Sequence, residues 1–238
     1  MDFQDRVALV TGGTGALGSA VVRDLLAAGA HVAATYTVET EWQHFVAGTA
    51  HFRARLKGIP VDLTEADEVK TAVQSLHNDH GRLDFLLAIA GGFAAGKVHE
   101  TSEAVWDRML NLNLKTLFSI LRPVIPVMLK QNFGRIITVS SGAIVNGPGA
   151  GIAAYAVSKA AVRHLSEVLA EEVKGHNIRV HCLMPGTMDT EANRRTMPNA
   201  DFSQWVTTAE VAGLIHRLLL NDAGSPLVVP ILRPGEVR

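Results

Sequence analysis

The sequence has little cysteine and little net charge, and each shortage excludes a class of protein. Its 238 residues contain a single cysteine, Cys182, which excludes an internal disulfide and fits a reducing compartment. The formal net charge of −1 leaves no basic excess for a nucleic-acid partner. The N-terminal residues carry no signal-peptide pattern, and no apolar run is long enough to span a bilayer. We therefore expect a cytoplasmic protein without a membrane or nucleic-acid partner.

Metal-binding patterns are also lacking. The ten histidines are scattered, with no closely spaced pair of metal-ligand type, so we expect no metal site. Hydrophobic residues make up 47% of the chain and charged residues 19%, which is typical of a globular protein. The length suits one sizeable α/β domain and is short for two, so we interpret residues 1–238 as a single domain.

A glycine-rich turn near the N-terminus is the first chemical signal. It joins the apolar run 7–10 to a segment with helical periodicity at 19–29, and a second apolar run follows at 31–36. Gly13, Gly15 and Gly18 fit the G-x-G-x-x-G pattern, which lets the backbone approach a pyrophosphate at a helix N-terminus. Glycines also occur in ordinary turns, but this strand–turn–helix setting favours dinucleotide binding.

Apolar strands and amphipathic helices alternate along the rest of the chain. Strands are expected around 59–63, 83–90, 134–141, 177–184 and 227–232, and helices around 64–77, 102–120, 152–174 and 208–220. Asp62 or Thr64 could cap the helix at 64–77, which Gly81 ends, and the helix at 102–120 could continue through Pro123 and Pro126 with breaks. This alternation predicts an α/β fold: a Rossmann-type, doubly wound parallel sheet with helices on both faces. Residues 187–205 are polar and read as irregular. Ligands of such sheets bind where the strands end, which directs attention to the residues after each strand.

A second signal lies before and within the helix expected at 152–174. Tyr155 and Lys159 are one turn apart on one helix face, where an ammonium would lower the pKa of a phenol from near 10. Such pairs also occur by chance on solvated helices. Here Ser140 and Ser141 end the preceding strand, as a hydroxyl that orients a carbonyl should, although strand-end serines can simply cap turns.

Taken together, these residues resemble the short-chain dehydrogenase/reductase family over essentially the whole chain. The matching stretches are Thr11–Gly18, Asp62-Leu63-Thr64, Ala90-Gly91, Leu112-Asn113-Leu114, Val139-Ser140-Ser141, Tyr155-x-x-x-Lys159 and Pro185-Gly186-x-x-x-Thr190. The resemblance implies hydride transfer between NAD(P) and a small carbonyl or alcohol. It implies that Tyr155 is the general acid or base and that Ser141 binds the substrate oxygen. Lys159 would hold the nicotinamide ribose, and Asn113 a relay water.

The resemblance also implies a set of cofactor contacts. Asp62 would contact the adenine, and Thr190 together with the Met188 backbone would contact the nicotinamide carboxamide. The full set is Gly12, Gly13, Thr14, Gly15, Ala16, Leu17, Tyr36, Asp62, Leu63, Ala90, Gly91, Tyr155, Lys159, Pro185, Gly186, Met188 and Thr190.

Four departures from the family pattern affect these expectations. Ala16 replaces a glycine of the turn, and Ala88 replaces an asparagine that braces the strands. Ser141 lies fourteen residues before Tyr155, one more than is usual, so Ser140 stays a second candidate. Tyr36 stands where an acidic residue would bind the ribose of NAD, so the cofactor prediction is NAD(P)(H) with a slight lean to NADPH.

A closer resemblance, to dihydropteridine reductase, is carried by residues 12–18, 90–94 and 189–205. It implies a substrate lid over about 187–207 and leaves reduction of a quinonoid pterin as an alternative, while the serine pair favours ordinary carbonyl chemistry. Phe202 and Trp205 would pack within the lid or contact a flat substrate. A non-catalytic NAD(P)-binding sensor or scaffold is the alternative from another class of function.

The family resemblance further implies a homodimer or homotetramer. Small residues such as Ala154 and Ala160 would permit close packing or would face the sheet.

Overall fold

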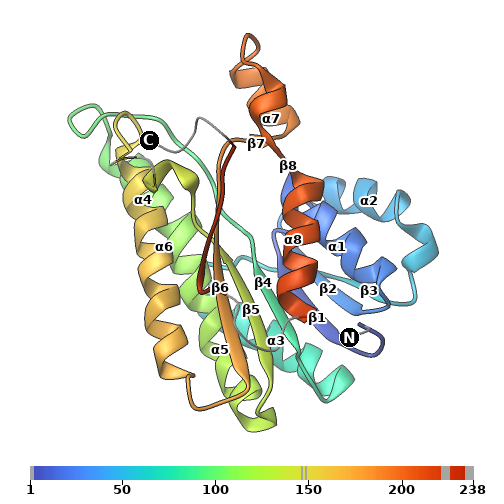
Figure 1. The fold of residues 1–238 in the computed structure, drawn as a ribbon. Helices are drawn as coiled ribbons and strands as arrows, with labels where there is room; N and C mark the ends of the chain where they lie inside the picture. The colour runs from blue at the N-terminus through green and yellow to red at the C-terminus, as the bar shows by residue number, and fades with distance from the viewer. Residues whose placement is uncertain (1–2, 146, 148, 221–225, 234–238) are drawn as a thin grey trace.

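The computed structural model describes residues 3–145, 147, 149–220 and 226–233 (Figure 1). Its centre is a seven-stranded sheet of parallel strands in the order β3-β2-β1-β4-β5-β6-β9. The strands are β1 (Val7–Thr11), β2 (His31–Tyr36), β3 (Leu56–Pro60), β4 (Phe85–Ala88), β5 (Gly134–Val139), β6 (Ile178–Pro185) and β9 (Val228–Ile231). The strand order reverses direction between β1 and β4, which is where such sheets bind ligands.

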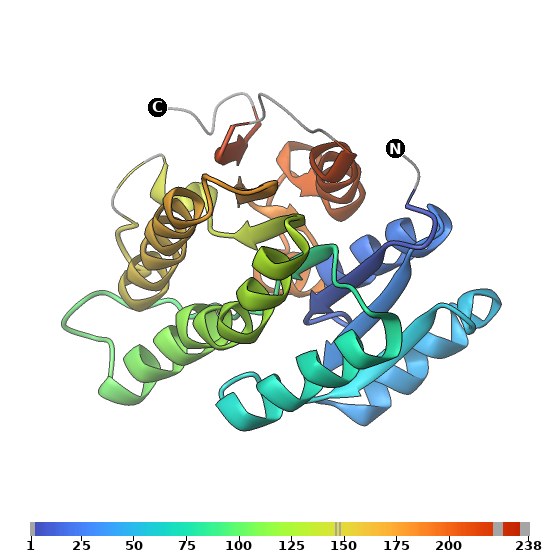
Figure 2. The same ribbon diagram turned by 90° about the horizontal axis from the view of Figure 1, so that it is seen from below.

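The central strands are buried on both faces because helices cover both sides (Figure 2). One face carries α1 (Ala16–Ala27), α2 (Glu39–Ala47) and α8 (Thr208–Leu220), and its core includes Leu25, Phe45 and Ile215. The other face carries α3 (Ala66–His80), α5 (Thr116–Gln131) and α6 (Ala153–Glu172), with Val73, Val124 and Val162 in its core. The structure thus confirms the predicted doubly wound Rossmann-type architecture.

One helical segment is longer than the sequence indicated. Helix α4 (Glu103–Leu110) runs through a π-helical turn at 111–115 directly into α5, with Pro123 and Pro126 inside the helix. The expected breaks at these prolines do not occur. Pro126 is exposed and Pro123 half-buried, and each removes one N–H donor from the helix.

This continuous segment also bears on the expectation that no apolar run could span a bilayer. Among the described residues, Glu103–Gln131 is one helix that is long enough to cross a membrane and that contains an 18-residue window with a mean hydropathy of 1.4. The segment contacts α3 and α6, and Leu117, Ile120, Val124 and Met128 are buried in the core. These contacts identify it as a core helix of the fold that leaves part of its apolar surface uncovered.

Two local predictions need correction. The N-terminus of α3 is not capped by Asp62 or Thr64, because the Asp62 carboxylate instead accepts hydrogen bonds from the backbone and hydroxyl of Thr64. Gly81 does end the helix, in a left-handed conformation with φ of 69°.

Residues 187–207 are not simply irregular, since they form β7 (Met188–Asp189), α7 (Glu191–Thr196) and β8 (Val206–Thr207).

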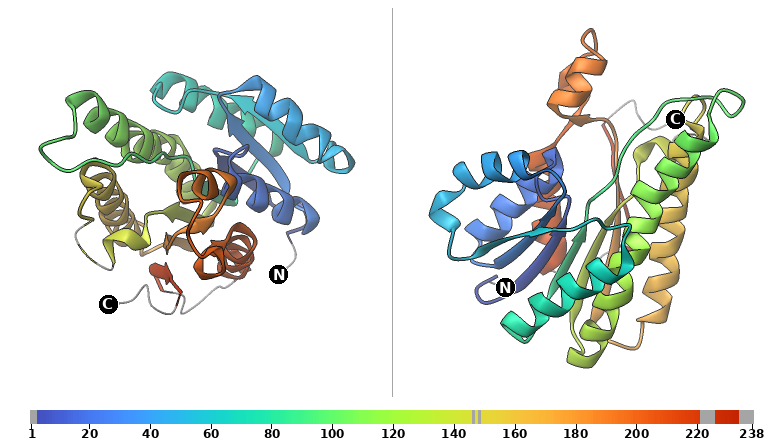
Figure 3. Two further views of the ribbon diagram at one scale, coloured as in Figure 1. Left: turned by 90° about the horizontal axis from the view of Figure 1, so that it is seen from above. Right: turned by 180° about the vertical axis from the view of Figure 1, so that it is seen from behind.

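The segment 187–207 stands apart from the sheet at the carboxyl ends of the strands (Figures 1 and 3). β7 pairs in parallel with β8, which closes the segment at its base. Arg194 pairs with Asp189 and lies over the Phe202 ring, 4.6 Å from the ring centroid. The Phe202 ring contacts Trp205 at 4.7 Å, so the segment has its own small aromatic cluster. This contact supports the packing interpretation of both rings.

Candidate active site

The glycine turn is held against the end of β2. Thr35 anchors it twice, because its hydroxyl accepts from the Gly12 N–H (3.1 Å) and its carbonyl from the Gly13 N–H (3.0 Å). Gly12 has φ of 65°, a left-handed conformation that favours glycine. A Cβ on Gly18 would lie 2.1 Å from the Gly12 carbonyl oxygen. The sequence pattern therefore reflects a close approach of α1 to the turn.

The N-terminus of α1 provides a cradle that fits a pyrophosphate. Its N-cap residue is Gly15, no side chain caps it, and its first turn contains no acidic residue. A Cβ on Gly15 would meet only the Gly12 carbonyl oxygen at 3.3 Å, so the approach to this helix end is open. Exposed N–H groups and the positive end of the helix dipole suit a phosphate. Ala16, the departure from the family turn, begins the helix without disturbing it.

The other predicted cofactor residues cluster at the same edge of the sheet. Tyr36 ends β2, while the remainder follow the ends of β3, β4 and β6: Asp62, Leu63, Ala90, Gly91, Gly186, Met188 and Thr190, with Pro185 as the last residue of β6. The missing asparagine brace at Ala88 is replaced from β1, because the Thr11 hydroxyl accepts from the N–H groups of Ile89 and Ala90 at 3.0 and 3.1 Å.

Two groups predicted to contact the carboxamide already have intramolecular partners. The Thr190 hydroxyl accepts from the Asn193 N–H (3.2 Å) and caps α7, while the Met188 carbonyl accepts from the Asn193 side chain (2.8 Å). The cofactor contacts assigned to this segment therefore remain predictions that compete with α7 capping.

The hydroxyl, phenol and ammonium converge at the end of β5. The Ser141 hydroxyl accepts from the Ala143 N–H (3.2 Å) and interacts with the phenol of Tyr155, which lies in the first turn of α6. The Ser140 hydroxyl instead donates to the Lys159 carbonyl (2.7 Å) and is buried. Of the two serines, Ser141 is therefore the one whose hydroxyl faces the phenol. The Lys159 ammonium is buried, donates to the Val139 carbonyl (2.9 Å), and lies 5.9 Å from the Tyr155 ring centroid.

The protonation of this cluster differs from the expectation that Lys159 lowers the pKa of Tyr155. Burial raises the pKa of the Tyr155 phenol above its usual value, and the hydrogen bond with Ser141 only opposes that rise. Burial also lowers the pKa of Lys159 to about 8. Near neutral pH the phenol therefore carries its proton, which is the state that a general acid needs.

Asn113 joins the loop after β4 to the helix that carries the phenol. Its Oδ1 accepts from the Gly92 N–H (2.8 Å), and its Nδ2 donates to the Gly92 carbonyl (3.1 Å) and to the Ser158 hydroxyl (2.9 Å). Ser158 in turn donates to the Tyr155 carbonyl (2.7 Å). Both amide protons of Asn113 are thus engaged. A relay water could therefore not accept a hydrogen bond from this amide, so that role stays a prediction.

Three residues near this site were not singled out for these roles from the sequence. Ser158 is buried and connects Asn113 with Tyr155, Phe93 contacts the Tyr155 ring, and Glu39 accepts a hydrogen bond from the Tyr36 hydroxyl. No local pattern distinguishes them, because each contact joins segments whose distance depends on the fold. The described part of the chain contains no cluster of three or more residues that could hold a metal.

Comparison with known proteins agrees with this geometry. The model of the short chain dehydrogenase family matches residues 6–201. The dehydrogenase/reductase SDR family member 4 of Oryctolagus cuniculus is 30% identical over 223 residues, which cover 93% of this chain and 82% of the relative. The 3-oxoacyl-[acyl-carrier-protein] reductase FabG of Escherichia coli is 31% identical over 194 residues, covering 82% and 78%.

A solved structure of a related enzyme has the same fold. An NAD+-bound xylitol dehydrogenase superposes with a TM-score of 0.88 at 26% identity, covering 98% of this chain and 100% of the other. The chain therefore belongs to the short-chain dehydrogenase/reductase family and is an NAD(P)-dependent oxidoreductase of small carbonyl or alcohol substrates.

Proposed function

We propose that the protein reduces a small carbonyl compound, with Tyr155 as the general acid. The observation that carries this proposal is the convergence of the Tyr155 phenol, the Ser141 hydroxyl and the buried Lys159 ammonium at the end of β5. When bound, the nicotinamide cofactor supplies or accepts the hydride at the substrate carbon. Ser141 orients the carbonyl oxygen by a hydrogen bond, and Tyr155 donates its proton to that oxygen as the alcohol forms.

The other assigned residues prepare this step. Lys159 places an ammonium between β5 and α6, beside the phenol, and would hold the nicotinamide ribose. Asn113 fixes the position of Tyr155 through Ser158, and we retain it as the candidate holder of a relay water. The cradle at the N-terminus of α1 and the strand ends that follow it would hold the dinucleotide. In oxidation the same groups act in reverse, with Tyr155 as the base.

The experiment is a panel assay of the purified protein with NADH and NADPH. The panel contains alkyl ketones, aryl ketones and quinonoid dihydropterin, and cofactor oxidation is followed by absorbance. Turnover of ketones above the dihydropterin supports the proposal. Preference for the dihydropterin would favour the pterin alternative. Tight cofactor binding without turnover of any member would favour a sensor or scaffold.

The preference between NADH and NADPH depends on the charged side chains in the region where β2 meets α2. The slight lean to NADPH depends on the absence of an acid at the end of β2, but the structure brings two carboxylates there from α2. The Tyr36 hydroxyl donates to Glu39 at 2.8 Å, and the Thr14 hydroxyl donates to Glu41 at 3.1 Å. Hydrogen bonds from Gln43 and Tyr36 lower the pKa of Glu39, which keeps it anionic. These contacts support a preference for NADH over NADPH, against the sequence-based lean, because an anion repels the extra phosphate.

Replacing Glu39 with lysine tests this preference. We expect the ratio of kcat/KM for NADPH to that for NADH to rise by roughly tenfold, which corresponds to about 1.4 kcal/mol, because a repulsive charge becomes attractive. Glu172→Gln, at the exposed far end of α6, is the matched control and should leave the ratio unchanged. A wild-type preference for NADPH, or an unchanged ratio in Glu39→Lys, would contradict the assignment.

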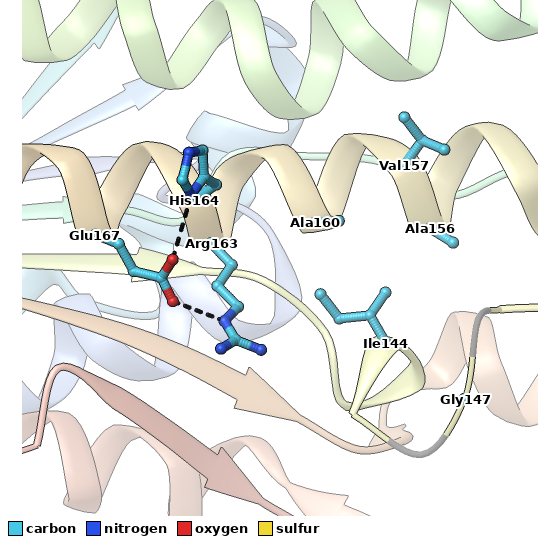
Figure 4. A pocket seen from close by; sticks show the side chains of 8 residues that line it. All are labelled: Ile144, Gly147, Ala156, Val157, Ala160, Arg163, His164 and Glu167. Carbon is cyan, nitrogen blue, oxygen red and sulfur yellow. Dashed lines mark hydrogen bonds and ion pairs between the residues drawn. The ribbon is translucent and has the colours of Figure 1, made fainter.

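We further propose that the protein is a homodimer or homotetramer in which α4, α5 and α6 form an interface. Five exposed large apolar side chains lie on these helices and the π-turn between two of them: Trp106, Leu112, Phe118, Val157 and Val168. Beside α6 there is a groove of about 410 Å³, which Ile144, Ala160 and Glu167 help to line (Figure 4). Ala160 is exposed at this groove, whereas Ala154 is buried. The exposed small side chain permits close approach of a second copy.

Val157→Asp tests the interface, because Val157 is 46% exposed and lines the groove. We expect light scattering to give a multiple of 25.5 kDa for the wild type and 25.5 kDa for the variant, since a buried unpaired carboxylate is costly. Val38→Asp, which introduces the same charge at an exposed position next to α2, should keep the wild-type mass. A wild-type protein of 25.5 kDa would refute the proposal.

We also propose that residues 1–238 act as one NAD(P)-binding domain, with residues 187–207 as its substrate lid. The position of α7 over the carboxyl ends of the strands supports the lid assignment (Figure 3).

We also propose a cytoplasmic location for the protein. The proposal depends on Cys182, which is a buried free thiol, and cell fractionation would test it.

A further inference from the structure

The loop after β4 is held at both ends next to the phenol. At one end, the Asn113 amide engages both the N–H and the carbonyl of Gly92. At the other end, the Gly96 N–H donates to the Gly151 carbonyl (2.7 Å), and the Gly96 carbonyl accepts from the Ala153 N–H (2.9 Å). The segment 92–96 therefore spans from the Asn113 helix to the start of α6.

Phe93 lies within this anchored segment and contacts the catalytic phenol. Its ring centroid is 4.9 Å from that of Tyr155, and the two ring planes make an angle of 68°, an edge-to-face arrangement. Phe93 nevertheless leaves 62% of its surface exposed. A phenylalanine that served only to pack the core would be covered. Most of this ring instead faces outward beside Tyr155, and a substrate that reaches the phenol would cover it.

The same network positions Phe93 and Tyr155. Asn113 holds Gly92, the residue before Phe93, and it also binds Ser158, which bonds to the Tyr155 carbonyl. The distance between the two rings is therefore controlled from one buried amide. This coupling is what a substrate wall requires, because it must keep a constant distance from the proton donor.

The chemistry of the flanking loops indicates the type of substrate. Residues 89–96, which follow β4, and residues 139–145, which contain Ser141, include no Asp, Glu, Lys, Arg or His. Val145, at the end of the second loop, is an exposed apolar side chain. An anionic group of a substrate that packed against these two loops would therefore find no charged partner on either of them and would lose hydration there. The flanks of the phenol are therefore suited to a neutral, apolar compound.

We propose that Phe93 is a specificity-determining residue that packs against a flat apolar substituent of a neutral carbonyl substrate, such as the ring of an aryl ketone. This inference rests on the proposed function, since the carbonyl oxygen must at the same time reach Tyr155 and Ser141. The ring of Phe93 then distinguishes substrates by the group beside the carbonyl.

The test compares acetophenone with 2-butanone in the wild type and three variants. Phe93→Ala is expected to lower kcat/KM for acetophenone by roughly tenfold or more and to leave that for 2-butanone nearly unchanged, because only the aryl ketone uses the ring. Phe93→Trp should retain the preference. Val98→Ala is the matched control, because Val98 is 83% exposed on the same stretch of chain, and it should change neither value.

The outcomes separate this inference from the function on which it rests. If Phe93→Ala lowers both substrates equally, the ring only positions Tyr155, and the specificity role is overturned. Unchanged kinetics in Phe93→Ala would also overturn it, with the proposed function intact. Failure of the wild type to reduce either ketone with NADH or NADPH would overturn the proposed function and this inference together.

Discussion

Tyr155→Phe is expected to lower kcat for carbonyl reduction by roughly 10²- to 10⁴-fold, the usual contribution of a positioned general acid. The substitution removes only the phenolic hydroxyl, which interacts with Ser141. The ring remains, so its edge-to-face contact with Phe93 and the helix that carries it should persist. Because no charge or backbone group of the cradle changes, titration calorimetry should give an unaltered dissociation constant for the cofactor.

The second tyrosine of the chain provides a matched control. Tyr36→Phe removes a phenolic hydroxyl that bonds to Glu39 at the end of β2, away from the Ser141 and Lys159 groups. We expect this variant to retain kcat within a few-fold, because its hydroxyl does not contact the reacting atoms. Normal turnover by Tyr155→Phe, or an equal loss in both variants, would remove Tyr155 from the role of proton donor.

Gly18→Ala is expected to destabilise the fold and abolish cofactor binding. In an ordinary helix the change from glycine to alanine stabilises by about 1 kcal/mol. Here the new Cβ would lie 2.1 Å from the Gly12 carbonyl oxygen and 2.9 Å from its carbon, both of which are backbone atoms that no rotamer change can move. Helix α1 or the glycine turn must shift. We therefore expect a net loss of about 3 kcal/mol or more, as in an overpacked core.

Thermal unfolding with and without cofactor measures both effects. For a chain of this length, a loss of about 3 kcal/mol lowers Tm by roughly 6 to 12 °C, and the stabilisation by NADH or NADPH should disappear. Gly15→Ala is the control for the fold, because its Cβ would meet only one atom, at 3.3 Å. It should keep a near-native Tm. A Gly18→Ala protein with unchanged Tm and normal cofactor stabilisation would show that the close approach of α1 to the turn is not required.

Local sequence signals were sufficient for most of the fold because they depend on neighbouring residues. The apolar run 7–10, the glycine turn and the helical periodicity that follows together predicted β1, the cradle and α1 at nearly their observed positions. The helix over 208–220 was predicted to the residue, and Gly81 ended α3 as expected. The errors arose where packing against the rest of the fold overrides a local sequence signal. Pro123 and Pro126 predicted breaks, but packing on the sheet keeps α5 helical.

By itself, the sequence determined the family, the order of the elements and the residue types needed for hydride-transfer chemistry. Only the tertiary structure decided which partner each of these residues has. It turned Ser141 toward the phenol and bonded Ser140 to the Lys159 carbonyl, and it brought Glu39 and Phe93 to the two ends of the site. The physical reason is that periodicity and turn chemistry act over a few residues. Contacts such as Asn113 with Ser158, 45 positions apart, form only when the packed sheet brings distant segments together.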